Sequence, residues 1–239
     1  MNILLFNNLT EKDKSDAVER LITNSTPHQD FFMMIIFSVL MATFGLLLNS
    51  AAVVIGSMLI APILYPILSL SLGIVMSDSK LISRAFFTGL KAIGIGIASA
   101  IIITLFFSVK NYEVTPEILA RAEPSLLYVA VAIVAGLAVS FALVKPHLNE
   151  AFPGIAVSVA LIPPIAAIGI GIAKLDWSIV SGSFMLLIIN ILGIIFASML
   201  VFSLMNLYLK KRVAIETAQK EDKKLEQQET QAENKSEKK

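Results

Sequence analysis

The sequence has no cysteine among its 239 residues, and it contains only two histidines and one tryptophan. The absence of thiols excludes a disulfide framework, a zinc–thiolate site and a cysteine nucleophile. His28 and His147 are too few and too far apart in the sequence to indicate a metal cluster. We therefore expect no metal and no other cofactor.

Charged residues are also scarce, at 15% of the chain, against about 25% in a typical soluble domain. Only thirteen of the thirty-seven charged side chains lie between residues 31 and 208. A net charge of +1 provides no basic field for nucleic acid, so we expect no nucleic-acid partner. Hydrophobic residues make up 56%, and the mean hydropathy is +0.79. This composition predicts an all-α polytopic membrane protein in a lipid bilayer.

Long apolar runs divide the middle of the chain into membrane spans, since a helix needs about 20 apolar residues to cross the hydrocarbon core. Turn residues and charges separate these runs. The six predicted spans are Phe31–Leu48, Ala51–Met76, Ala85–Val109, Leu126–Val144, Gly154–Ala173 and Trp177–Leu209.

The distribution of lysine and arginine predicts the orientation of these spans. If the N-terminus is cytoplasmic, nine of these residues flank the spans inside, and only Lys110, Arg121 and Lys174 lie outside. We therefore expect a multi-pass protein of the plasma (inner) membrane with both termini in the cytoplasm.

The two ends of the chain differ from the six-helix domain of residues 31–209. Residues 1–30 are predicted to be a cytoplasmic segment containing an amphipathic helix, because Ala17, Val18, Leu21 and Ile22 have helical spacing. Residues 210–239 are highly charged and predict a largely disordered cytoplasmic tail. A solvated tail is the simpler interpretation, and a partner-binding role is the alternative.

Two halves of the membrane domain have similar features. Ser57 precedes Pro62 by five residues, as Ser158 precedes Pro163, and Lys91-Ala-Ile-Gly aligns with Asn190-Ile-Leu-Gly. Each half contains three predicted spans, an odd number, so two copies must have opposite orientations. The pattern predicts inverted three-helix repeats at 31–109 and 126–209, as in many secondary transporters.

Prolines lie in the middle of the second and fifth predicted spans, namely Pro62 with Pro66 and Pro163 with Pro164. A proline removes one helical hydrogen bond and clashes with the preceding turn. One interpretation is a pair of discontinuous helices, with Pro62 and Pro164 at the start of half-helices whose amide ends attract a polar ligand. The alternative is a pair of kinked helices shaped for packing.

A few polar residues lie inside the predicted spans and are candidates to bind a solute. Lys91 and Asn190 lie well inside the third and sixth predicted spans, where polar groups are often functional. Lys91 is alternatively a snorkelling lysine, and Asn190 an interhelical hydrogen-bond donor. The small residues Ala132, Gly136 and Ser140 predict a helix contact within or between protomers. The candidate binding set is Ser57, Pro62, Pro66, Lys91, Ser158, Pro163, Pro164 and Asn190.

No aspartate or glutamate lies inside a predicted span; the nearest, Asp78, Glu150 and Asp176, are in connections. A proton relay of membrane carboxylates is therefore not expected. The sequence also has no HExxH pair and no serine–histidine dyad within the spans, so we do not expect an enzyme.

Three stretches resemble a known family: Ala42–Pro62 continuing to Pro66, Phe152–Pro164, and Leu187–Gly193. They are similar to the bacterial and archaeal hydrophobic membrane family catalogued as domain of unknown function number 389. The resemblance covers about Phe31 to Tyr208 and supports the layout of spans. It implies no substrate and no reaction.

The inverted repeat and the paired prolines favour a secondary transporter or channel-like protein for a small polar or ionic solute. The alternative is a non-transporting scaffold, lipid-interacting or stress-sensing module that uses its charged tail and amphipathic N-terminus as contact surfaces. Six spans with small-residue faces are also compatible with a homo-oligomer.

Overall fold

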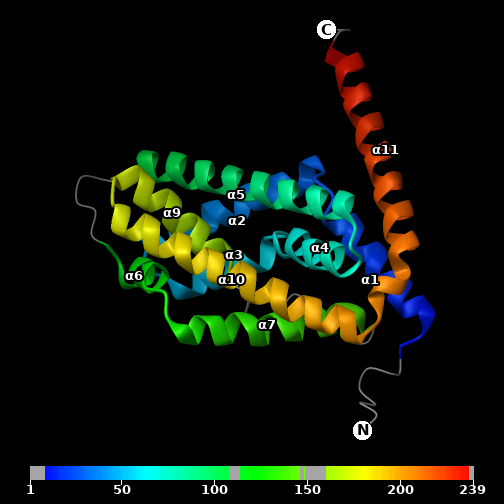
Figure 1. Cartoon of the computed structure of the whole chain (residues 1–239). Helices are drawn as coiled ribbons and strands as arrows, with labels where there is room; N and C mark the ends of the chain where they lie inside the picture. Colours follow the sequence, from blue (N-terminus) through cyan, green and yellow to red (C-terminus); the bar gives the residue numbers. More distant parts are fainter. Residues whose placement is uncertain (1–8, 108–113, 146–147, 149–159, 237–239) are drawn as a thin grey trace.

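The computed structural model describes residues 9–107, 114–145, 148 and 160–236, and all regular structure in these residues is helical. The helices form one bundle, with α1 and α11 together at one end and α6 at the other (Figure 1). The ends are called here the α1 end and the α6 end. The helices are α1 (Glu11–Asn24), α2 (Gln29–Leu47), α3 (Ala51–Ile60), α4 (Leu64–Val75), α5 (Ser79–Phe107), α6 (Pro116–Ala122), α7 (Leu126–Val144), α9 (Ile162–Lys174), α10 (Trp177–Leu204), the 3-10 helix η2 (Leu207–Lys210) and α11 (Lys211–Ser236).

Four of these helices, α2, α5, α7 and α10, are long and apolar enough to cross a membrane. The α3–α4 pair passes the same test only as one segment, because α3 and α4 have only 10 and 12 residues, and the two helices are bent by 53° relative to each other. The described residues therefore contain four or five candidate spans, which identifies a helical membrane protein. Many large side chains point outward from these helices, including Phe106, which is 82% exposed, as expected for a surface that faces lipid.

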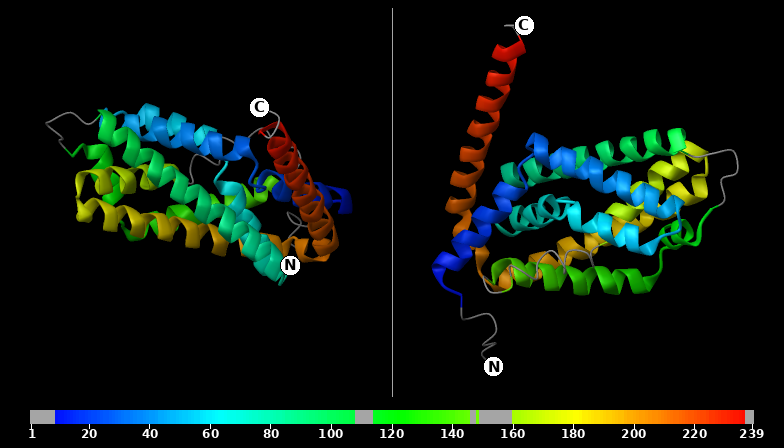
Figure 2. Two further views of the ribbon diagram at one scale, coloured as in Figure 1. Left: turned by 90° about the horizontal axis from the view of Figure 1, so that it is seen from above. Right: turned by 180° about the vertical axis from the view of Figure 1, so that it is seen from behind.

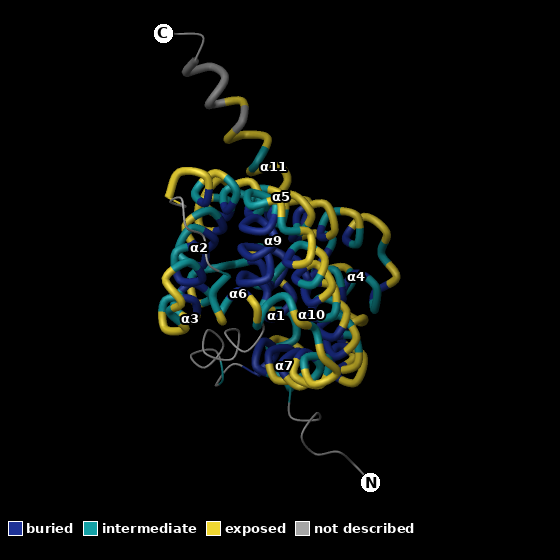
Figure 3. The backbone as a smooth tube through the Cα atoms, turned by 90° about the vertical axis from the view of Figure 1, so that its left-hand side faces the viewer, coloured by how far each residue is buried: buried dark blue, intermediate teal, exposed yellow. Residues whose placement is uncertain are grey.

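The fifth predicted span, Gly154–Ala173, is described only in part. Only α9, a helix of 13 residues, is described there, and it is too short to cross a bilayer alone. Residues 149–159, including Ser158, lie outside the described residues. Every residue from Leu161 to Gly171 is buried, and α9 lies in the centre of the bundle, in contact with α5, α10 and α2 (Figure 3).

Small residues let the other long helices approach one another closely. A Cβ atom added to Gly136 of α7 would lie 2.8 Å from the Ala197 side chain of α10. Ser140 of α7 also donates a hydrogen bond to Ser198 of α10 over 2.8 Å. The small-residue face predicted on α7 is therefore a contact within the protomer. Because α10 covers this face, it does not serve as a contact between protomers.

The α6 end is closed by side chains that cap helices of neighbouring segments. Thr115, which caps α6, donates its hydroxyl hydrogen to the carbonyl of Leu46 over 2.7 Å. Asn49, in the turn between α2 and α3, accepts from the Glu117 amide over 3.2 Å. These bonds hold the α2–α3 turn against α6, so the two halves of the chain meet here.

The C-terminal segment differs from the expected disordered tail, because residues 211–236 form a single helix, α11. Its first half packs against α1, and Ala214, Thr217, Ala218 and Glu221 are buried. The amphipathic α1, whose Thr10–Asp13 capping box fixes its start, provides the other side of this contact. Tertiary packing therefore orders a sequence whose composition alone indicates disorder. Beyond this contact α11 projects away from the bundle and runs across the direction of its helices (Figure 2).

Candidate functional site

The break between α3 and α4 lies where the prolines predict it. Ala61 has extended backbone angles (φ −77°, ψ 123°), as the residue before a proline prefers, and α4 begins at Leu64. Pro62 therefore lies inside the break and does not start α4 as expected, whereas Pro66 is buried in the first turn of α4. The Pro62 carbonyl accepts from the Tyr65 amide over 3.2 Å, which makes a tight turn between the helices.

A serine of another helix satisfies a carbonyl next to this break. Because Ala61 is no longer helical, the Ser57 carbonyl lies outside the regular hydrogen-bond pattern of α3. Ser38 of α2 donates to that carbonyl over 2.6 Å. The Ser57 hydroxyl donates to Val54 in its own helix, also over 2.6 Å. Ser57 is fully buried, so it stabilises the break through its backbone and does not present its hydroxyl to a cavity.

The second pair of prolines has a different environment. Pro163 and Pro164 lie in the first turn of α9, which begins at Ile162, not at Pro164 as expected. Ile165 and Ala166 beside them are fully buried. Asn190 of α10 donates from its side-chain amide to the Ala160 carbonyl over 2.8 Å, just before the helix begins.

Lys91 does not line the pocket at the first break. It is exposed on the outer side of α5, beside Leu90, which is 54% exposed. This position on the bundle surface favours the snorkelling interpretation, in which the ammonium group reaches the headgroup layer. The structure thus brings Ser57, Pro62 and Pro66 together, and Pro163, Pro164 and Asn190 together, but it does not add Lys91 to either group.

An open surface pocket of about 280 Å³ lies between the α1 end of the bundle and the first break. Pro62 and Tyr65 line it at the break, and His28 and Asp30 line it where α1 is joined to α2. The remaining lining residues are Thr23, Asn24, Phe31 and Met34. The sequence analysis missed His28 and Asp30 as lining residues. Their only signal was their position immediately before a predicted span.

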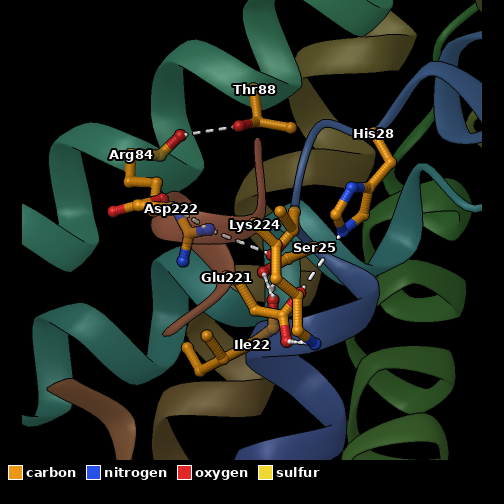
Figure 4. A network of polar contacts seen from close by, with 9 residues as sticks. Ile22, Ser25, His28, Arg84, Thr88, Glu221, Asp222 and Lys224 are labelled. Carbon is orange, nitrogen blue, oxygen red and sulfur yellow. Dashed lines mark hydrogen bonds and ion pairs between the residues drawn. The ribbon is translucent and has the colours of Figure 1, made fainter. Parts of the chain in front are cut away.

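His28 also contacts α11 and so joins the cavity to the C-terminal helix. Its Nε2 lies 3.4 Å from a carboxylate oxygen of Glu221, whose other oxygen lies 2.8 Å from the ammonium group of Lys224 (Figure 4). The Glu221 side chain is only 4% exposed. Burial raises the pKa of this carboxyl, but the bonds from Lys224 and His28 outweigh it, and the net pKa is lowered. Glu221 is therefore a buried carboxylate held by partners on both sides.

Arg84 of α5 makes a second contact with α11. Its Nη2 lies 2.9 Å from the Asp222 carboxylate and donates to the Thr26 hydroxyl over 3.0 Å. The Arg84 carbonyl in turn accepts from Thr88 over 2.9 Å (Figure 4). The arrangement fixes α11 against the start of α5, and it offers ion pairing but no catalytic group. Histidine, aspartate and glutamate side chains in the described part of the chain do not gather into a set of three that could hold a metal.

Comparison with known proteins places the chain among relatives whose activity is not established. It is 27% identical over 211 residues to an uncharacterized protein of Methanocaldococcus jannaschii. The alignment covers 82% of this chain but 63% of that protein, so the chain spans less than two thirds of the length of its relative. No solved structure matches the chain.

The family model described as Domain of unknown function (DUF389) matches residues 58–196, which include both pairs of prolines, Lys91 and Asn190. This segment is more than half of the chain and contains α4, α5, α6, α7 and α9 in full. The chain therefore belongs to the family of membrane proteins described as Domain of unknown function (DUF389).

Proposed function

We propose that this protein is a secondary transporter or channel-like protein that moves a small polar or ionic solute across the plasma membrane. The observation that carries the proposal is the open pocket at the α1 end, whose lining includes Pro62 and Tyr65 at the break. Non-helical backbone inside a membrane protein is tolerated where protein or cavity water satisfies its polar groups. Such breaks are the usual place for a solute in transporters built from repeats.

The directions of α4 and α9 support the inverted-repeat architecture. Both helices begin among buried residues, but α4 ends at the turn beside Lys211 at the α1 end, whereas α9 ends beside the start of α10 at the α6 end (Figure 1). Half-helices that leave the interior in opposite directions are expected if 31–109 and 126–209 are inverted copies. In this proposal a solute meets the polar groups at the half-helix starts and not a membrane carboxylate, because side chains of other helices already pair with the Ser57 and Ala160 carbonyls.

The charge distribution supports a cytoplasmic location for the α1 end. Lys80, Lys210 and Lys211 gather there with α1, and Arg121 and Lys174 lie at the opposite end. Positive residues favour the cytoplasmic side of short connections. The cavity at His28 would then open toward the cytoplasm. The proposal includes no chemical conversion of the solute.

A flux measurement tests the proposal directly. The full chain is reconstituted into liposomes, and uptake is screened across panels of inorganic ions and small polar metabolites. We expect uptake of at least one class, and a loss of at least fivefold on Pro62→Ala, which favours a continuous helix at the break. Pro116→Ala, at the first turn of the surface helix α6, is the matched control and should leave flux unchanged. Absence of uptake for every solute in the panels contradicts the proposal.

The scaffold alternative is favoured by one observation, an exposed stretch of α11 beyond its contact with the bundle. Residues 226–228 are exposed and lie beyond the contact with α1. Removing residues 225–239 leaves the buried Glu221 and its partners in place. A cellular phenotype that is lost on this truncation while flux is unchanged supports the scaffold function, and loss of flux supports transport.

A further inference from the structure

A second polar cavity, of about 540 Å³, lies between the first two turns of α5 and one side of α11. It shares no lining residue with the cavity at Pro62. Three cationic side chains line it, those of Lys80, Arg84 and Lys211, together with the carboxylates of Asp78 and Asp222. The cavity thus has an excess of one positive charge.

The carboxylates do not use all the cationic groups. The Asp78 carboxylate lies 3.5 Å from the Lys211 ammonium group, and the Asp222 carboxylate pairs with Nη2 of Arg84. In the described part of the chain Lys80 has no ion-pair partner, and Nη1 of Arg84 is buried without a hydrogen-bond acceptor. A buried donor without an acceptor is unfavourable. An oxygen-rich anion can contact the exposed Lys80 directly, and a small movement of the Arg84 side chain would let the same anion accept from Nη1 without displacing Asp222.

The backbone at the start of α5 is not the anion-binding group. Asp78 already accepts from the amides of Lys80 and Leu81, each over 3.1 Å. Recognition of an anion would therefore depend on the side chains of Lys80 and Arg84. A guanidinium group and an ammonium group together suit phosphate oxygens, which accept several charged hydrogen bonds at once.

The surroundings of the cavity indicate where such a phosphate comes from. Ala85 and Phe86 follow Arg84 directly and line an apolar groove of about 420 Å³ between α4, α5 and α10. No polar side chain lines this groove, and its floor includes Gly89 and Pro66. Cations at the end of a membrane helix, next to an apolar groove on the same helix, match the headgroup and acyl chain of a phospholipid.

We propose that this cavity binds the phosphate of an anionic phospholipid through Lys80 and Arg84, with an acyl chain of the same lipid along the groove at Gly89. The site is independent of any transported solute. Because Asp222 on α11 forms one wall, the lipid also stabilises the position of α11 against α5.

The test uses the purified full chain in detergent and follows its thermal unfolding midpoint during titration with dioleoyl phosphatidylglycerol or dioleoyl phosphatidylcholine. We expect phosphatidylglycerol to stabilise the protein at concentrations at least fivefold lower than phosphatidylcholine. Lys80→Gln should abolish this preference, whereas Lys220→Gln, the same charge change at an exposed position of α11 outside the cavity, should preserve it. Lys80 is exposed, so its substitution leaves the fold intact.

Two further arms identify the source of the phosphate. Gly89→Leu places a side chain in the groove, where a Cβ meets nothing closer than Pro66 at 3.9 Å, and it should weaken binding of phosphatidylglycerol. Inorganic phosphate and glycerol phosphate should not reproduce the stabilisation. The proposal is overturned by equal responses to both lipids, by an unchanged preference in Lys80→Gln, or by full stabilisation with soluble phosphate.

Discussion

The side-chain amide of Asn190 donates to the main-chain carbonyl of Ala160 over 2.8 Å and so joins the middle of α10 to the start of α9. Ser38 has the same relationship to the Ser57 carbonyl at the other break. At each break a polar side chain from a different helix replaces a missing main-chain donor. In lipid, such a replacement is what allows helices to be interrupted.

Replacing Asn190 by leucine should therefore destabilise the protein. The change preserves size but leaves the Ala160 carbonyl unpaired, at a cost of about 1–2 kcal/mol. Thermal unfolding in detergent measures the effect. Leu192→Ala, at a residue of α10 that is 60% exposed, is the control and should change the midpoint much less. Equal effects of the two substitutions would show that the bond contributes nothing.

Two glycines provide a matched test of helix packing. A Cβ atom at Gly169 of α9 would contact the Ala100 side chain and lie 2.9 Å from the Ile97 carbonyl of α5, so Gly169→Ala should cost about 1–3 kcal/mol. Gly94 of α5 has nothing within 4 Å, and Gly94→Ala should be neutral or stabilise the helix by up to about 1 kcal/mol. Chemical denaturation in mixed micelles compares the pair. A neutral Gly169→Ala would contradict the close contact of α9 and α5.

The contact of α11 with the bundle should depend on Glu221. Glu221→Gln removes the charge that holds His28 and Lys224, and it should weaken docking of α11 by about 1 kcal/mol, since Lys224 is half exposed. Hydrogen exchange of α11 amides should then accelerate roughly fivefold. The control is Glu226→Gln, at an exposed position further along the same helix.

Acid should have the same effect as that substitution. The pKa of Glu221 is lowered in the folded protein from its ordinary value of 4.5. A lowered carboxyl pKa stabilises the folded state above the unfolded pKa, and this stabilisation is lost as the pH falls through the folded pKa. Protection of the α11 amides, taken relative to intrinsic exchange at each pH, should thus fall below pH 4.5 in the wild type, and this acid step should be smaller in Glu221→Gln. An identical pH profile for the two proteins would remove Glu221 from the explanation.

The absence of cysteine makes the orientation easy to measure. Single cysteines at Glu123, on the α6 end, and at Gln219, on α11, should react with an impermeant maleimide from opposite sides of the membrane. We expect Gln219→Cys to be protected in intact cells and Glu123→Cys to be labelled. The native chain gives no background reaction. Labelling of both positions from one side would contradict the proposed crossing of the bundle.

Hydrophobic patterning was sufficient to predict an all-α membrane protein and the positions of its long helices, because spans must be apolar over a fixed length. The prolines predicted the break near Pro62, because a proline removes a helical hydrogen bond whatever surrounds it. The docking of the helix at 211–236 on α1 could not be predicted, because the buried face of α11 consists of Ala214, Thr217, Ala218 and Glu221, which indicate no core until α1 is placed against them. The role of His28 was equally hidden, since its partner Glu221 lies 193 positions away in the chain.

The two breaks have unequal surroundings, and this makes the molecule asymmetric along its length. In the proposed transport function, a solute at Pro62 is separated from the far side by a bundle whose centre is α9, where residues Leu161 to Gly171 are buried. Gly169 lies against the α5 backbone with no room for even a methyl group. Onward passage thus requires a second conformation in which α9 has separated from α5, and the free energy of separating that contact sets how rarely the far side opens.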